Sequence, residues 1–499
     1  MIIDGQQRLT TVYLMLLAAR DVFDKTDAQG LSTADSDRAR QLFHDVVNKY
    51  APADSDEAFR VLSTVEDKPV LRALVERAPS LEKSYTASSM VAAHNYFVKT
   101  LRALSLDRQR LVEFVIGGLR KLLVFSINFT ESDDACSAFS DINGKGQRLT
   151  GIDLIKNFLV MEVQRSNKVL GLEGAYSRVW EPLQKHIPPS GIEDFFHTFL
   201  YVNYEDVQKG QIYTELVKHY REFLETHTPD DYVAYLHRSA SAYAEVVSKG
   251  TASLDDYPEL KVFIRRLSSQ FGISGKTLAL SLLLAVRDGR INRKQLTDAV
   301  QICQTALIRY FFNDEDHHVA GPVGAFARRL QVARSEDFLS ELRKGLGHRL
   351  FPNDQEYRQR LTSYSAMPWS NKKSAVILYT LYLVESHLSS EPPPIGEFAV
   401  EHIWPQTWHG TEWETVYADK EPPADLVNCL GNLTLISQKL NSQLRNMGPQ
   451  TKIPALASSS ALMNRNYFTE HSPTWRAKDI EKRREWLADF IVETITPSF

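Results

Sequence analysis

Three stretches near the C-terminal end decide how this part of the chain folds: Glu401-His402-Ile403-Trp404-Pro405, Gly431-Asn432-Leu433 and Asn441. We expect residues 400–403 to form a short strand that ends before the proline, because proline has no N–H for a ladder. Residues 426–430 are predicted to form a second strand, and apolar residues from Leu433 onward recur at helical spacing. The order strand, long loop, strand, helix predicts a small ββα unit.

These stretches also bring together side chains that suit the hydrolysis of a phosphodiester. A Mg2+ ion takes oxygen ligands, usually one or two from the protein, and Glu401 and the Asn441 carbonyl oxygen can supply them. His402 titrates near neutral pH and suits a general base. Asn432 can hold a backbone segment or orient the imidazole. Neighbouring strand residues point to opposite faces, so Glu401 and His402 can serve one site only at a strand end or bulge.

The pattern Glu-His-Ile-x-Pro, Gly-Asn-Leu-Thr-Leu and Leu-Asn resembles the HNH (His-Me finger) nuclease domain of GmrSD-type modification-dependent restriction endonucleases. The resemblance implies that His402 is the general base and that Glu401 and Asn441 bind Mg2+ or Mn2+. It also implies that Asn432 belongs to the catalytic site by supporting its fold. Glu401 stands where many HNH domains have aspartate, which is one methylene shorter. The alternative is an ordinary surface or core histidine before a strand that ends at proline.

A second polar motif, Asp4-Gly5-Gln6-Gln7-Arg8, precedes an apolar helix. A helix N-terminus attracts phosphate, and an arginine adds a bidentate donor. The motif also resembles the signature of the GmrS-like half of the same family, whose ParB/sulfiredoxin-like domain is implicated in nucleotide binding and hydrolysis. The resemblance implies a nucleoside triphosphate site made by Asp4, Gln6, Gln7 and Arg8. Family members carry several dozen residues before the motif, so we expect a domain without its first strands. A capped helix with a structural ion pair at Arg8 is the alternative.

A third segment repeats the tetrapeptide Gln-Arg-Leu-Thr of residues 7–10 at residues 147–150. It follows a predicted strand at residues 122–129, and Asn143, Lys145 and Arg148 are candidates for nucleotide or DNA contacts. A glycine-rich turn without a ligand stays equally open for Asn143 and Lys145. For Asp153 and Lys156 we favour an ordinary helix start, with Thr150 or Asp153 as the cap.

Composition limits the remaining possibilities. A chain of 499 residues predicts two or three domains. The formal net charge of −4 gives no global basic field, so binding of DNA requires a local basic patch. Three cysteines without CxxC spacing argue against a thiolate zinc site and fit a reducing cytoplasm. No apolar run approaches the roughly 18 residues of a membrane span, so we expect no membrane partner.

The predicted fold is mainly α with small α+β parts: a ParB/sulfiredoxin-like remnant at residues 1–165, a helical middle region at 166–388, and an HNH nuclease domain at 389–499. A proline run at residues 392–394 is the predicted linker before the last domain. Seven helices are expected in the region between the two ends, over residues 195–202, 211–225, 230–247, 257–271, 276–288, 293–312 and 372–386.

The predicted function is a metal-dependent DNA endonuclease or nickase that a nucleotide regulates, acting in the cytoplasm on modified phage DNA. Its expected partners are double-stranded DNA, a nucleotide and a second copy in a homodimer. Two alternatives stay open. The first is a catalytically silent nucleotide- or DNA-binding sensor that keeps the nuclease fold. The second is a nucleotide hydrolase whose C-terminal domain only binds.

Overall fold

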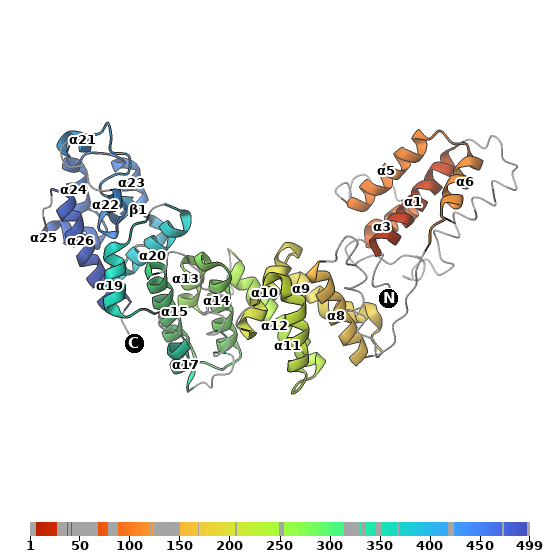
Figure 1. Ribbon diagram of the computed structural model, residues 1–499, viewed down its shortest axis with the longest axis horizontal. Helices are drawn as coiled ribbons and strands as arrows, with labels where there is room; N and C mark the ends of the chain where they lie inside the picture. The colour runs from red at the N-terminus through yellow and green to blue at the C-terminus, as the bar shows by residue number, and fades with distance from the viewer. Residues whose placement is uncertain are drawn as a thin grey trace. The chain divides into compact units, whose positions relative to one another are not determined.

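A computed structural model describes residues 6–26, 37, 41, 68–77, 88–119, 121–123, 150–167, 169–204, 207–248, 254–313, 327, 330, 336–345, 351–366, 369–417, 424–471 and 474–496. The chain divides into two compact units, Met1–Arg148 and Leu149–Phe499 (Figure 1). The described residues are mainly helical, and their single sheet has two strands, which confirms the predicted fold class.

Four helices make up most of the described part of the first unit: α1 (Gln6–Lys25), α3 (Lys68–Glu76), α5 (Ser89–Ala103) and α6 (Arg108–Leu119). Helix α1 packs against α5 and α6, and α3 packs against α5. The α1 helix has apolar side chains on opposite sides, so it contributes to two small clusters that include Leu17 and Phe23. Most of the predicted strand at residues 122–129 lies outside the described residues.

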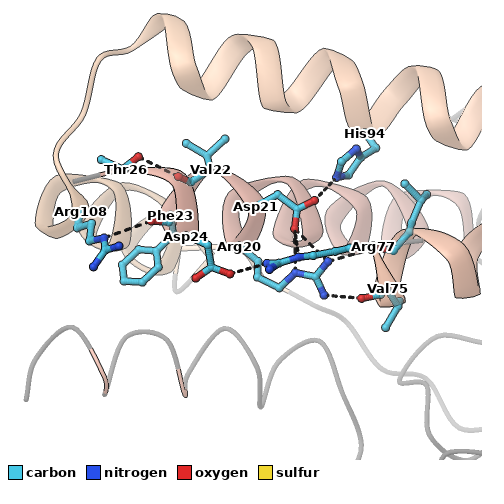
Figure 2. A network of polar contacts seen from close by, with 11 residues as sticks. Arg20, Asp21, Val22, Phe23, Asp24, Thr26, Val75, Arg77, His94 and Arg108 are labelled. Carbon is cyan, nitrogen blue, oxygen red and sulfur yellow. Dashed lines mark hydrogen bonds and ion pairs between the residues drawn. The ribbon is translucent and has the colours of Figure 1, made fainter. Parts of the chain in front are cut away.

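A network of polar contacts joins three of these helices (Figure 2). Arg20 of α1 donates to the last carbonyl oxygens of α3, with its Nη1 2.9 Å from Val75 O. Its neighbour Asp21 accepts from Arg77 Nε at 2.8 Å and contacts His94 Nε2 of α5 at 3.2 Å. Burial opposes the charge of Asp21, but bonds from His94, Arg20 and Arg77 hold the pKa of its carboxyl below the usual value. These contacts fix the helix whose first turn carries the Gln6-Gln7-Arg8 motif.

Among its described residues, the second unit begins with eleven helices in chain order: α8 (Gly151–Ser166), α9 (Gly171–His186), α10 (Ile192–Asn203), α11 (Ile212–Phe223), α12 (Pro229–Val247), α13 (Pro258–Arg266), α14 (Gly272–Arg287), α15 (Arg293–Asn313), α17 (Phe338–Gly345), α19 (Asp354–Ser363) and α20 (Asn371–Leu388). Thr150 caps α8 and forms a reciprocal capping box with Asp153, which confirms the ordinary helix start favoured there. Helix α8 packs on α9 and α11, so it lies in the second unit.

The predicted helices of this region are present, with one break. The helix expected over residues 257–271 ends at Arg266, and a 3-10 turn leads to Gly272, whose φ is +55°. A Cβ at Gly275 would lie 1.7 Å from Ser268 O, so this close approach of two backbone segments requires glycine. By length and composition, Ser268–Arg287 is apolar enough to span a membrane, but 67% of it is buried inside the fold, as in a core helix.

One buried histidine in this region predicts how stability depends on pH. Burial lowers the pKa of His219 on α11 to about 4, whereas an unfolded histidine titrates near 6.5. Between these values only the unfolded chain binds the proton, so stability is complete above about pH 6.5 and is lost as the pH falls. We expect His219 to account for a loss of up to about 3 kcal/mol at pH 4.

Denaturant unfolding at several pH values between 7 and 4 checks this expectation. His219→Phe keeps the ring among the aromatic side chains around it and removes the titrating group. We expect its stability to fall less steeply with acid than that of the natural chain. The matched control is His186→Phe, because His186 is exposed. Equal acid sensitivity of His219→Phe and the natural chain would contradict the assignment.

The last part of the second unit holds the sheet. Strand β1 (Phe398–His402) pairs antiparallel with β2 (Leu433–Ser437), with His402 opposite Leu433. The helices that follow are α23 (Gln438–Leu444), α24 (Pro449–Ala457), α25 (Leu462–Glu470) and α26 (Ala477–Phe490). Two short helices, α21 (Glu412–Tyr417) and α22 (Ala424–Val427), interrupt the connection between the strands. The predicted order strand, long loop, strand, helix is therefore present.

The second strand of this unit lies later than predicted. Residues 426–430 form the end of α22 and a turn, and the strand is β2, where we expected a helix to begin. Leu433 and Ile436 belong to the strand, and Leu440 and Leu444 belong to α23, so their common helical spacing spans two elements. The Ser437 side chain accepts from Leu440 N and starts the helix at Gln438.

Helix α20, which comes before the proline run, packs against both strands and against α25. The buried Glu385 carboxylate of α20 accepts from the backbone N–H groups of Leu462 and Met463, at 2.7 and 2.8 Å, at the start of α25. A carboxylate at a helix N-terminus satisfies N–H groups that have no partner within the helix. The proline run thus joins elements of one compact unit, and α20 supports the sheet that carries His402.

Candidate active site

The candidate site lies where β1 ends, and its two central side chains have different neighbours. His402, half-buried, lies 5.1 Å from Trp369 between ring centroids, and its Nε2–H donates to Asn428 Oδ1 at 3.2 Å. Glu401 forms an ion pair with Lys452 of α24 instead. This difference follows from the alternation of side chains along a strand.

The histidine is neutral at physiological pH. Burial is the main reason that the pKa of His402 is lowered to about 4; the bond to Asn428 opposes this shift, and the nearby positive charge of Lys452 adds to it. Asn428 Oδ1 also accepts from Gln406 Nε2 at 2.7 Å. Because an amide oxygen only accepts, the proton of neutral His402 is on Nε2 and the lone pair is on Nδ1. The imidazole is therefore in the unprotonated form that a general base requires, but its pKa lies below the near-neutral value that the sequence predicts, because the side chain is buried.

A buried ammonium joins three segments of the site. Lys452 is fully buried, and its Nζ donates to His402 O at 2.7 Å, to Arg445 O at 3.1 Å and to the Glu401 carboxylate. Burial raises the pKa of Glu401 and lowers that of Lys452, and the attraction between them opposes both shifts. These three acceptors match the three N–H donors of an ammonium group. We therefore assign Lys452 and Glu401 as a charged ion pair.

Asn432 holds the backbone beside the site. Its side chain is fully buried, and its Oδ1 accepts from Trp404 N at 2.8 Å and from Trp475 Nε1 at 3.0 Å. Its Nδ2 donates to the carbonyl oxygens of Trp404 and Val427, at 2.9 and 2.7 Å. All four partners are protein groups, so Asn432 joins the end of β1 to the turn before β2 and to a core tryptophan.

Asn441 completes the set of predicted oxygen donors. It lies on α23, which packs against both β1 and β2, and its side chain is partly exposed. Within the described part of the chain, this side chain forms no hydrogen bond. No group of three or more His, Cys, Asp or Glu side chains among the described residues is placed to hold a metal ion.

These donors fit a hard divalent cation better than zinc. Mg2+ takes oxygen ligands and keeps several waters, so it requires only one or two protein groups. A carboxylate has two oxygens, so Glu401 can bind Lys452 through Oε1 and offer Oε2 to a cation. The Asn441 carbonyl oxygen is the second candidate donor, on a helix that packs against the same strand. Ligating carboxylates commonly hold such a second partner, here Lys452.

The predicted nucleotide site lies only in part among the described residues. Gln6, Gln7 and Arg8 form the first turn of α1, and Arg8 is exposed. Asp4, Asn143, Lys145 and Arg148 lie outside the described residues. The structure therefore places part of the motif at a helix N-terminus.

Sequence reasoning missed two residues of the site, Asn428 and Lys452. Asn428 is buried and interrupts the apolar run Leu426-Val427-Asn428-Cys429-Leu430. Lys452 shares a buried helical stripe with Leu456, four residues later. A polar residue inside an apolar pattern is the signal that could have identified both.

Two family models match the chain. The model described as "GmrSD restriction endonuclease, N-terminal domain" matches residues 1–160, and "GmrSD restriction endonucleases, C-terminal domain" matches residues 351–490. No curated protein matches at a significant level. Both models describe one class of protein, the restriction endonucleases, which are nucleases that act on DNA. Since the two domains follow each other in one chain and together cover more than half of it, the chain belongs to the GmrSD restriction endonuclease family.

Proposed function

We propose that this protein is a metal-dependent DNA endonuclease or nickase whose active site is the end of β1. The observation that supports this most directly is the neutral His402, with its Nε2–H bound to Asn428 and its Nδ1 lone pair available. It lies next in sequence to Glu401, and α23, which carries Asn441, packs against the same strand. A base and two oxygen donors are the groups that hydrolysis of a phosphodiester requires.

In this mechanism His402 Nδ1 takes a proton from the attacking water. Asn428 holds the imidazole in the required tautomer, and Trp369 covers its ring. Glu401 and Asn441 would hold the divalent cation, Mg2+ or Mn2+, and a bound cation would stabilise negative charge at the scissile phosphate and on the leaving oxygen. Asn432 keeps the strand end in place and does not itself touch the substrate.

Metal removal tests the proposed function. The purified chain is incubated with supercoiled plasmid in Mg2+ or Mn2+, and we expect nicked or linear product that excess EDTA abolishes. Without the cation, the charge at the scissile phosphate and the leaving oxygen is not stabilised. Cleavage that persists in EDTA would contradict the metal dependence. Absence of any cleavage, together with DNA binding, would favour the catalytically silent sensor.

We further propose that a nucleoside triphosphate regulates this activity at the Asp4-to-Arg8 motif, and that the protein restricts modified phage DNA in the cytoplasm. Two observations support this proposal. The N-terminal domain model of the restriction endonuclease family matches residues 1–160, and Gln6, Gln7 and Arg8 lie at the start of α1. The plasmid assay tests this regulation when cleavage is compared with and without added nucleotide, and on modified and unmodified DNA.

A further inference from the structure

The turn after α23 contains a residue in an unfavourable backbone conformation. Met447 N donates to Leu444 O at 2.8 Å, and between them Arg445 has a φ of +38° and a ψ of −120°. These angles belong to the first central position of a type II′ turn, where glycine is preferred. An arginine at this position is strained, and such strain is found mainly at functional sites.

Two of the other three described non-glycine residues with positive φ have side-chain partners that Arg445 lacks, and the third, Ser105, lies in the turn after α5. The Arg77 side chain forms ion pairs with Asp21 and Asp24, and Trp475 lies in the core and donates to Asn432. Arg445 is exposed, and its guanidinium forms no hydrogen bond or ion pair with any residue that the structure describes. Its side chain is therefore available to a molecule outside the chain.

The buried ammonium of Lys452 fixes the Arg445 turn beside the active site. One Nζ donates both to Arg445 O, at 3.1 Å, and to His402 O, at 2.7 Å. The strained turn and the last residue of β1 are therefore separated by a single buried nitrogen. The exposed side chain of Arg445 is therefore anchored close to the strand end at which the proposed function places the scissile phosphate.

We propose that Arg445 binds a backbone phosphate of the DNA strand next to the scissile one. A guanidinium is planar, always charged and suited to bidentate contact with phosphate oxygens. The net charge of the chain is −4, so local cations of this kind must supply the attraction for DNA. This inference rests on the proposed function, because it assumes that DNA is cleaved at His402.

The test measures binding separately from cleavage. In a His402→Ala background, the affinity for a short DNA duplex is measured by fluorescence anisotropy at several salt concentrations, without divalent metal. We expect Arg445→Gly to weaken binding about tenfold for every duplex sequence, since a charge-assisted phosphate contact is lost. The slope of log K against log salt should become shallower by about one. Arg445→Lys keeps the charge and should retain most of the slope.

Two further variants separate the side chain from the backbone. Arg445→Ala removes the same charge as Arg445→Gly but retains the strained φ. The two should bind DNA equally, while the glycine variant should have a higher Tm than either the alanine variant or the natural chain. Arg465→Ala removes another exposed arginine, on α25, and should leave the salt slope unchanged.

The outcomes distinguish this inference from the proposed function. An Arg445→Gly protein that binds DNA with unchanged affinity and salt slope overturns the inference, whether or not the natural chain cuts plasmid. If the natural chain binds DNA through Arg445 but never cuts it, the phosphate contact stands and the proposed nuclease activity fails.

Discussion

His402→Ala should lower the rate of plasmid cleavage by about two to four orders of magnitude at saturating Mg2+ or Mn2+. The substitution removes the only histidine at the end of β1, whose tautomer Asn428 sets and whose ring Trp369 covers. Burial lowers the pKa of His402 to about 4, so the imidazole is already neutral at pH 7 and accepts a proton without first losing one. The effect should therefore appear in kcat.

The matched control is His409→Ala. His409 lies in the same connection between the strands, but it is exposed, and its Nδ1 contacts Glu414 at 3.3 Å. We expect this variant to cleave at nearly the rate of the natural chain. Time courses of supercoiled plasmid loss compare the two variants directly. Cleavage by His402→Ala at the natural rate would remove His402 from the mechanism.

Asn432→Ala should lower the free energy of unfolding by about 4 kcal/mol. Its amide satisfies four buried groups, on Trp404, Val427 and Trp475, and each group left without a partner costs about 1–3 kcal/mol. The neighbouring Gly431 packs closely on α26, where an added Cβ would lie 2.2 Å from Ile480 O, so a larger residue does not fit beside Asn432. Guanidinium denaturation followed by tryptophan fluorescence measures the loss.

Asn466→Ala is the control for this change, because Asn466 is exposed on α25. It should unfold within about 0.5 kcal/mol of the natural chain. A destabilisation below 1 kcal/mol in Asn432→Ala, combined with lost cleavage, would mean that Asn432 takes part in the reaction itself. Lost stability with normal cleavage by the molecules that remain folded would assign it a structural role alone.

The sequence predicts the elements of the site better than their boundaries. Pro405 predicts the end of β1 to within one residue, because its effect on a ladder is local; the strand ends at His402 and begins two residues earlier than predicted, at Phe398. The second strand is misplaced because residues 433, 436, 440 and 444 share a helical spacing although they belong to β2 and α23. Its position depends on pairing with β1, which lies more than thirty residues earlier. Local periodicity does not contain that information.

The two site residues that the sequence does not predict are explained in a similar way. Asn428 and Lys452 contact His402 only after the chain has folded back on itself, across 26 and 50 residues. Neither belongs to the Glu-His or Gly-Asn-Leu motifs, so no spacing rule connects them to the base. The motif predicts Glu401 as a metal ligand, and its spacing contains no sign of the lysine that pairs with this carboxylate.

The ammonium of Lys452 provides a permanent positive charge beside Glu401 that belongs to the protein itself. In many small metalloproteins the bound ion holds the fold together, and removing it unfolds the chain. Here the charge of Glu401 is balanced whether or not a divalent ion is present. Under the proposed metal-dependent mechanism, catalysis and folding are therefore uncoupled: a cell in which free Mg2+ falls would keep an intact, inactive protein that regains activity without refolding.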